Sequence, residues 1–310
     1  MATVAALDIG TNSTRLLIRR DGEDLQRRLQ ITRLGEGVDA SRRLTPAAIT
    51  RTAAALGDYA RDIERHGVDA VRAVATSAVR DATNAGEFLD AAQAALGVRP
   101  EVIPGEEEGR LSFAGATTDL DPADGPFLVL DIGGGSTEFI LGTTAVDAIH
   151  SADIGSVRLT EAYIDSDPPR PEELLACQSI TEGHLDDVAA AFRDHGGLGS
   201  VRQLVGVAGT ITTAAAVELG LPDDSPPALH GFRLTREAAE DVFRTLATED
   251  REMRATNPGL HPGRVDVIVA GMCILVKVMR HLGVADCLVS QHDILDGVAA
   301  VLAGVGPAER

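Results

Sequence analysis

One twelve-residue pattern occurs twice in the chain, and it constrains the fold more than any other feature. Residues 7–18 read LDIGTNSTRLLI and residues 130–141 read LDIGGGSTEFIL, and the two copies align without a gap. In each copy an apolar run ends in Asp, a turn of small residues follows, and a second apolar run returns, which predicts a β-hairpin. The copies lie 123 residues apart (131 − 8), so the sequence indicates a duplicated domain rather than a short-period solenoid.

Helix and strand signals alternate after each copy, which is typical of α/β layers. Thr45-Pro46 predicts the start of a helix that runs toward residue 65, and Asn84 with Glu87 predicts a capping box for a helix ending near residue 96. Further strands are expected at residues 71–75, 102–103 and 204–207, and further helices from about residues 106, 171, 208, 235, 264 and 293.

The stretch 119–126 is rich in Asp and Pro and is the expected linker between the two halves. We therefore expect two α/β domains, residues 1–124 and residues 125–310. The last helix, from Asp293, can belong to the second domain or pack back on the first.

The charge balance excludes several classes of partner. Asp and Glu number 47 against 28 Lys and Arg, so the formal net charge is −19. Such a surface is a poor platform for nucleic acid or for an anionic membrane, and we expect neither as a partner. An anionic ligand would need arginines, backbone amides or a metal to overcome this field locally. The single lysine, Lys277, follows no glycine loop, which excludes a nucleotide site of the G-x-x-x-x-G-K-[ST] type.

Cysteine usage and hydropathy predict the compartment. The three cysteines have no C-x-x-C spacing, which argues against a disulfide framework or a zinc site of that type. The longest uncharged apolar run, residues 267–276, is too short to cross a bilayer. We therefore expect a cytoplasmic protein.

The two hairpin tips are the first candidates for chemistry. Small residues leave backbone N–H groups uncovered, so such a tip can bind phosphate, although a tip of this kind taken alone is more often an ordinary tight turn. Asp8 and Asp131, at the strand ends, would then hold Mg²⁺ beside the phosphate oxygens. The candidate phosphate-binding residues of the tips are Thr11, Asn12, Ser13, Gly133, Gly134, Gly135 and Ser136.

Two further turns follow predicted strands. The first carries the hydroxyl of Ser77 and the guanidinium of Arg80, which is either a phosphate ligand or a solvated surface charge. The second carries Gly209 and Thr210 at the start of a helix, where backbone amides favour anions.

The run Glu106-Glu107-Glu108 at a predicted helix start has two interpretations. Carboxylates in the first turn offset the positive end of the helix dipole, which explains at least two of the three. The third can be a general base that activates water.

Taken together, five segments in one order resemble the exopolyphosphatase and guanosine pentaphosphate phosphohydrolase (Ppx/GppA) family in its short form, without the C-terminal HD-type module. The segments are DIGTNS (8–13), TSAVR (76–80), IPGEEEGRL (103–111), DIGGGSTE (131–138) and GVAGT (206–210). The resemblance implies an α/β fold of duplicated ribonuclease-H-like domains, as in actin, sugar kinases and the Hsp70 ATPase, with the active site in a cleft between the domains.

The resemblance also implies residue roles. Glu108 matches the family's catalytic base, and Arg80 matches the arginine that contacts the scissile phosphoryl group. Asp131 and Glu138 match acidic residues that hold Mg²⁺, which Mn²⁺ can replace, or its water shell. The tips and the Gly209-Thr210 turn match the phosphate-cradling loops.

The implied function is exopolyphosphatase: release of orthophosphate from the end of inorganic polyphosphate by a Glu-activated water. The alternative is a guanosine pentaphosphate (pppGpp) phosphohydrolase, with pppGpp or ppGpp as substrate or inhibitor. A kinase of the same superfold and a non-catalytic regulator that binds alarmone or polyphosphate are the remaining alternatives. The family also implies a homodimer. A polymeric substrate needs a basic track, and its candidates, if they are not ordinary surface charges, are Arg233, Arg264, Lys277 and Arg280.

Overall fold

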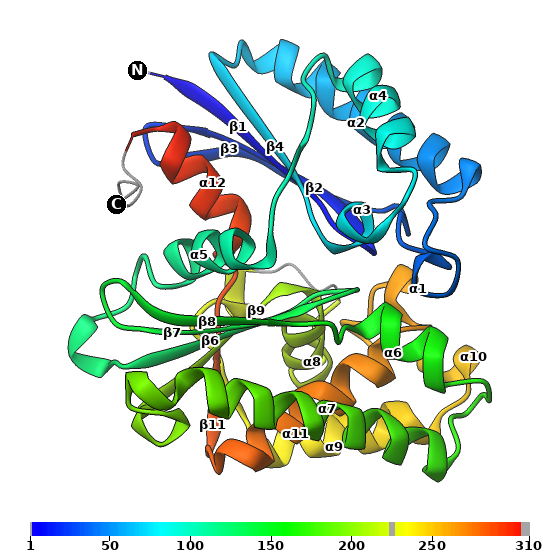
Figure 1. Ribbon diagram of the computed structural model, residues 1–310, viewed down its shortest axis with the longest axis vertical. Helices are drawn as coiled ribbons and strands as arrows, with labels where there is room; N and C mark the ends of the chain where they lie inside the picture. The colour runs from blue at the N-terminus through cyan, green and yellow to red at the C-terminus, as the bar shows by residue number, and fades with distance from the viewer. Residues whose placement is uncertain (1, 223–226, 305–310) are drawn as a thin grey trace. The chain divides into compact units, whose positions relative to one another are not determined.

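The computed structural model describes residues 2–222 and 227–304, and it divides into two compact units (Figure 1). The first unit comprises Met1–Thr118 with Asp293–Arg310, and the second comprises Asp119–His292. Each unit contains one copy of the repeated hairpin, so the chain is organised around the duplication.

The elements of the first unit are β1 (Thr3–Ile9), β2 (Ser13–Arg20), β3 (Glu23–Ile31), α1 (Val38–Ser41), α2 (Pro46–His66), β4 (Ala70–Ala75), α3 (Ser77–Asp81), α4 (Ala85–Leu96), β5 (Glu101–Val102), α5 (Gly105–Ala116) and α12 (Ile294–Leu302). Its sheet has the order β3-β2-β1-β4-β5. The strands β1, β2 and β3 form an antiparallel meander, whereas β4 pairs parallel to β1 and β5 parallel to β4.

Every residue of β1 is buried, so both faces of this sheet are covered at its central strand. On one face Leu7 and Ile9 pack in a cluster with Leu56 of α2 and Phe88 of α4. On the other face alternate residues of the same strands pack against α5 and α12. The buried members of that second cluster are Val4, Ala6, Leu17, Val74, Ile103, Leu111, Ile294, Leu295, Val298 and Ala299.

The last helix therefore belongs with the first unit, and α5 and α12 lie side by side in Figure 1. The sequence leaves open whether the last helix of the domain 125–310 belongs to that domain or packs back on the first. Residues 293–304 go with the first unit, because the apolar face of α12 completes the cover of its sheet. The structural division also falls at 118/119 rather than at 124/125.

The elements of the second unit are η1 (Pro122–Asp124), β6 (Phe127–Ile132), β7 (Thr137–Gly142), β8 (Val146–Ala152), α6 (Ser156–Tyr163), α7 (Pro171–Phe192), η2 (Arg193–His195), η3 (Leu198–Ser200), β9 (Gln203–Val207), α8 (Ala208–Glu218), η4 (Pro227–Leu229), β10 (Arg233–Thr235), α9 (Arg236–Thr248), α10 (Arg251–Arg254), η5 (Pro262–Arg264), α11 (Ile268–Leu282) and β11 (Asp286–Val289). Its sheet has the order β10-β11-β9-β6-β7-β8, and a large core packs α7, α8, α9 and α11 with it.

Five strands of the second sheet repeat the topology of the first. In both, the hairpin and the strand after it form an antiparallel meander, and the next strand pairs parallel to the first strand of the hairpin. This repetition confirms the expected fold class, a duplicated α/β domain of the ribonuclease-H-like kind. None of the helices within the described ranges is long and apolar enough to cross a membrane.

Two local expectations have different outcomes. Thr45 caps α2 as predicted, because its hydroxyl accepts from the backbone N–H of Ala48. The helix after Asn84 forms, but the predicted capping box does not. The Asn84 side chain instead makes hydrogen bonds to the backbone N–H and carbonyl of Leu44, and its amide also donates to Glu87.

Candidate active site

The first hairpin tip turns its carbonyls into the protein. Gly10 N–H donates to the Ser13 carbonyl at 2.9 Å, and the carbonyls of Thr11 and Asn12 accept backbone hydrogen bonds from the segment 32–35. The Oδ1 atom of Asn12 is buried without a hydrogen-bond partner among the described residues. Because buried polar atoms are normally paired, this amide is placed to meet a ligand or a water.

The turn that follows β4 lies beside this tip. Parallel pairing of β1 with β4 brings their carboxyl ends together, and Thr76 N–H donates to the Ile9 carbonyl at 3.2 Å. Gly35 fits between Thr11 and Ala78, since a Cβ there would lie 2.3 Å from the Thr11 side chain. The first tip and the buried Ser77 are therefore at one edge of the first sheet.

Arg80 and Glu108 form an ion pair within the first unit. One Nη of Arg80 lies 3.3 Å from Oε2 of Glu108 and donates to the Ile103 carbonyl at 2.9 Å. The Glu108 side chain is 13% exposed and that of Arg80 is 26% exposed. Arg80 is therefore no freely solvated charge. It presents a partly accessible guanidinium beside a carboxylate.

The three glutamates at the start of α5 have different environments. Glu106 is 69% exposed and pairs along the helix with Arg110, and Glu107 pairs with Arg72 at 3.7 Å. These two fit the helix-dipole interpretation. Glu108 alone of the three is largely buried and pairs with Arg80.

The second hairpin tip repeats the geometry of the first. Gly133 N–H donates to the Ser136 carbonyl at 3.0 Å, and the first amides of α6 donate to the carbonyls of Gly133 and Gly134. Arg158, which our sequence analysis did not single out, donates from Nε to the Gly135 carbonyl at 2.7 Å. The only sequence signal for Arg158 is a basic residue in a short helix, which has no special spacing to the tip.

Close contact with this tip explains the glycine that precedes α6. A Cβ on Gly155 would lie 2.4 Å from the Gly134 carbonyl oxygen, so the tip and the start of α6 meet backbone to backbone. The tip carbonyls are satisfied by α6, and the tip is fixed in place before any ligand binds.

The two hairpins differ in charge at one cross-strand pair. Asp8 is opposite Arg15 in the first hairpin, whereas Asp131 is opposite Glu138 in the second. Directly opposite residues on one face have Cβ atoms about 4.5–5.5 Å apart. Asp131 and Glu138 are 7% and 1% exposed. The first hairpin thus carries its own cation, and the second gathers two buried carboxylates.

Ion pairing distinguishes Asp8 from Asp131. Nη2 and Nε of Arg15 donate to Oδ2 of Asp8 at 2.7 and 2.9 Å, and Nη1 pairs with Asp293. Burial raises the pKa of Asp8 even beside Arg15. Burial alone would also raise the pKa of Asp293, but Arg15 and Arg27 outweigh it and the pKa is lowered. Asp8 therefore differs from Asp131 in having a paired arginine, and its role as a metal ligand stays a prediction.

The turn between β9 and α8 is strained at the first residue of α8. Ala208 has a φ of 66°, a left-handed conformation that is uncommon for a residue with a side chain. Gly209 lies against the guanidinium of Arg264, which donates to the Gly209 carbonyl and to Thr213. Asp131 is the register partner of Val207, so this turn follows the strand beside Asp131.

The residues expected to form a basic track are already engaged. Arg233 pairs with Asp286, Lys277 with Glu182 and Arg280 with Glu240. Arg264 is buried against the turn between β9 and α8. These four cations therefore give no support to a basic track on the surface.

Comparison with known protein families and known proteins identifies sequences similar to this chain. The Ppx/GppA phosphatase family matches residues 18–300. Exopolyphosphatase 2 of Mycobacterium tuberculosis is 42% identical over 321 aligned residues, which cover 98% of this chain and 99% of that protein.

Solved structures agree. The crystal structure of an exopolyphosphatase-like protein superposes with a TM-score of 0.91 at 38% identity, covering 98% of this chain and 99% of that one. The Ppx/GppA family member of Aquifex aeolicus superposes with a TM-score of 0.79 at 33% identity, covering 99% of each chain.

Proposed function

The chain belongs to the Ppx/GppA phosphatase family, and on that premise we propose that it is an exopolyphosphatase, a phosphoanhydride hydrolase that releases orthophosphate from the end of inorganic polyphosphate. The observation that carries the proposal is the 42% identity to an exopolyphosphatase over nearly the whole of both chains. The partly buried Arg80–Glu108 pair supports it, because hydrolysis needs a base and a cation beside the reacting phosphorus.

Glu108 is the proposed general base. Its carboxylate takes a proton from the attacking water as the water oxygen bonds to the terminal phosphorus and the bond to the bridging oxygen breaks. Arg80 holds Glu108 and donates to the phosphoryl oxygens, whose negative charge grows in the transition state. Ile103 fixes the guanidinium through its carbonyl, so little reorganisation is needed.

The hairpin tip of each unit and the turn after β4 or β9 in the same unit are the proposed phosphate-binding elements. They combine backbone N–H groups with hydroxyl and amide side chains, and the Asn12 amide has a buried oxygen still to be satisfied. The residues assigned to this role are Thr11, Asn12, Ser13, Ser77, Gly133, Gly134, Gly135, Ser136, Gly209 and Thr210.

Asp131 and Glu138 are the proposed metal residues. Two carboxylates at opposed positions are the hard oxygen donors that Mg²⁺ accepts while it keeps several waters, so this pair fits the ion. Ser151 donates to Glu138 at 2.8 Å and orients one of the two carboxylates. When bound, Mg²⁺ or Mn²⁺ neutralises charge on the phosphate oxygens.

We also propose an oligomeric state and a compartment. We expect a homodimer, which light scattering tests directly. We also expect a cytoplasmic location, where the three buried free cysteines stay reduced.

The test of this function is phosphate release with Mg²⁺ from long-chain polyphosphate, short-chain polyphosphate and pppGpp in parallel. We expect release chiefly from polyphosphate. Release chiefly from pppGpp would replace the proposal with a pentaphosphate phosphohydrolase. Tight binding of any of the three without release would indicate a regulator built on a hydrolase fold.

A further inference from the structure

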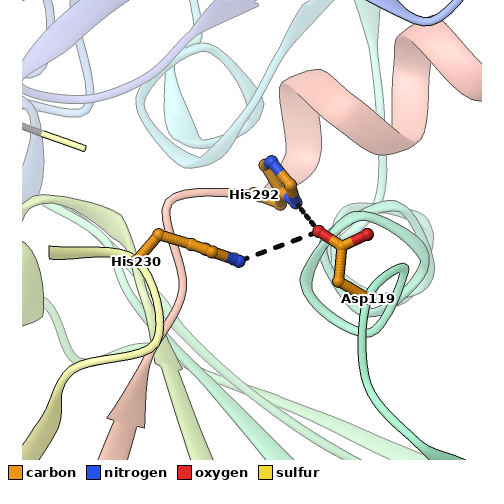
Figure 2. A group of neighbouring side chains, drawn as sticks. All are labelled: Asp119, His230 and His292. Atoms are coloured by element: carbon orange, nitrogen blue, oxygen red, sulfur yellow. Dashed lines mark ion pairs between the residues drawn. The ribbon is translucent and has the colours of Figure 1, made fainter. Parts of the chain in front are cut away.

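Three side chains outside the proposed phosphate chemistry converge in the second unit (Figure 2). Asp119 lies just before η1, His230 just before β10 and His292 just after β11. Because β10 and β11 pair antiparallel, with Arg233 opposite Leu288, the start of β10 and the end of β11 lie at the same end of the sheet. The topology therefore brings both histidines to one place.

Both imidazoles face the same carboxylate oxygen. Nδ1 of His292 lies 3.0 Å from Oδ2 of Asp119, and Nε2 of His230 lies 3.7 Å from it. The two rings are 4.6 Å apart between centroids, and one ligand atom from each residue lies within 4.8 Å of the others. A tetrahedral ion with bonds of about 2.0–2.2 Å holds its ligand atoms roughly 3.3–3.5 Å apart. Small rotations of the side chains bring this group to that spacing.

The geometry points to a binding site for one divalent ion of the zinc type, held by His230, His292 and Asp119. Two imidazoles and one carboxylate are a typical donor set for Zn²⁺, with the fourth position open to water. A net charge of −19 favours the approach of a cation. Asp119 is 55% exposed and the two histidines are about one-third exposed, so an ion can reach them from solvent.

Neighbouring groups hold His292 in place, and one of them makes a hydrogen bond to His230 that is lost when the ion binds. Ser290 Oγ accepts from the His292 N–H and donates to the His292 carbonyl, which fixes the backbone of that ligand. Gln291 N–H donates to Nδ1 of His230 at 3.2 Å, so the ring proton is on Nε2 when no ion is bound. Binding through Nε2 moves this proton to Nδ1 and gives up one long hydrogen bond for a metal bond.

The site lies where the chain enters and leaves the second unit, so a bound ion would affect the stability of the fold. The chain passes between the two units twice, at 118/119 and at 292/293. Two of the three ligands are the residues at which the second unit begins and ends. A bound ion would therefore fasten both ends of the second unit to the segment before β10, and it should stabilise the folded state by mass action.

The test is a calorimetric titration of untagged protein with Zn²⁺ after removal of metals by chelation. Excess Mg²⁺ is present throughout, so that the proposed Asp131–Glu138 site does not contribute. We expect one equivalent to bind with micromolar or tighter affinity. His230→Ala, His292→Ala and Asp119→Asn should each weaken binding by at least about tenfold.

His281→Ala is the matched control, because His281 is an exposed histidine on α11, outside the three-residue group. Circular dichroism without zinc verifies that each variant is folded. Absence of zinc binding by the wild type, or equal affinity in the wild type and the three variants, would overturn the proposal. The readout is binding, so the result does not depend on whether the protein hydrolyses polyphosphate.

Discussion

Arg80 is the residue on which the proposed chemistry converges, since it touches Glu108 and is accessible enough to touch substrate. We expect Arg80→Ala to lower kcat by about 10²–10³-fold, as the loss of a transition-state donor does, and to raise KM less. Arg110→Ala is the control, because Arg110 is exposed and pairs along α5 with Glu106. Steady-state kinetics on polyphosphate decides, and an unchanged kcat would return Arg80 to a structural role.

Arg15 is expected to matter for stability. It is the shared partner of Asp8 and Asp293, so Arg15→Met leaves two buried carboxylates without that cation. Loss of one partner of a buried ion pair costs about 3–5 kcal/mol of unfolding free energy. Arg61→Met removes an exposed pair with Asp58 and should cost no more than about 1 kcal/mol. Urea unfolding measures both, and equal losses would contradict this account.

The candidate site residues could be identified from the sequence, but the environment of each side chain could not. The run of three glutamates looks uniform in the sequence, and only the fold brings Arg80, 28 residues earlier, to Glu108 and not to its neighbours. Asp8 and Asp131 occupy equivalent repeat positions, yet Arg15 opposes one and Glu138 the other. Which residue lies opposite each aspartate is known only once the strands of the hairpin are paired in register.

Among the elements, α5 and α12 pack at glycine contacts. A Cβ on Gly297 would lie 2.1 Å from the Leu111 carbonyl oxygen, and one on Gly115 would lie 2.0 Å from that of Asp293. Gly297→Ala should therefore destabilise the protein by about 1–3 kcal/mol, although Ala is normally the better helix former. Because α5 carries Glu108, kcat should fall as well.

Gly57→Ala in α2 provides the matched comparison, since no described residue outside the helix's own backbone lies within 4 Å of its new Cβ. It should be neutral or stabilising by up to about 1 kcal/mol. Thermal unfolding of both variants is the measurement. A Gly297→Ala protein as stable as Gly57→Ala would mean that the two helices separate at no cost.

Most elements could be predicted from periodicity and caps, and the exceptions have physical reasons. Asn84 has the right neighbours for a capping box but makes its hydrogen bonds with Leu44, forty residues earlier. The third strand of each meander, β3 and β8, is only partly buried and lacks the apolar pattern of its neighbours. The place of α12 depends on which sheet face lacks cover, which no local signal reports.

For the whole molecule, a net charge of −19 has to be reconciled with a polyanionic substrate. The four candidate cations for a surface track are paired or buried, so we expect the metal, backbone amides and Arg80 to bind the substrate. We expect chelation to abolish activity and Mg²⁺ to restore it. Asp131→Asn and Glu138→Gln should raise the Mg²⁺ concentration needed for half-maximal activity, and metal-independent turnover would contradict their role.

The most direct test of the central claim is phosphate release from polyphosphate by wild type and Glu108→Gln at saturating Mg²⁺, with Glu106→Gln as control. Glutamine keeps the shape of the side chain but cannot accept the proton. We expect Glu108→Gln to bind polyphosphate as the wild type does and to release phosphate about 10²–10⁴-fold more slowly. Glu106→Gln should retain activity, because Glu106 is at the surface. Full activity in Glu108→Gln would contradict hydrolysis by a Glu108-activated water.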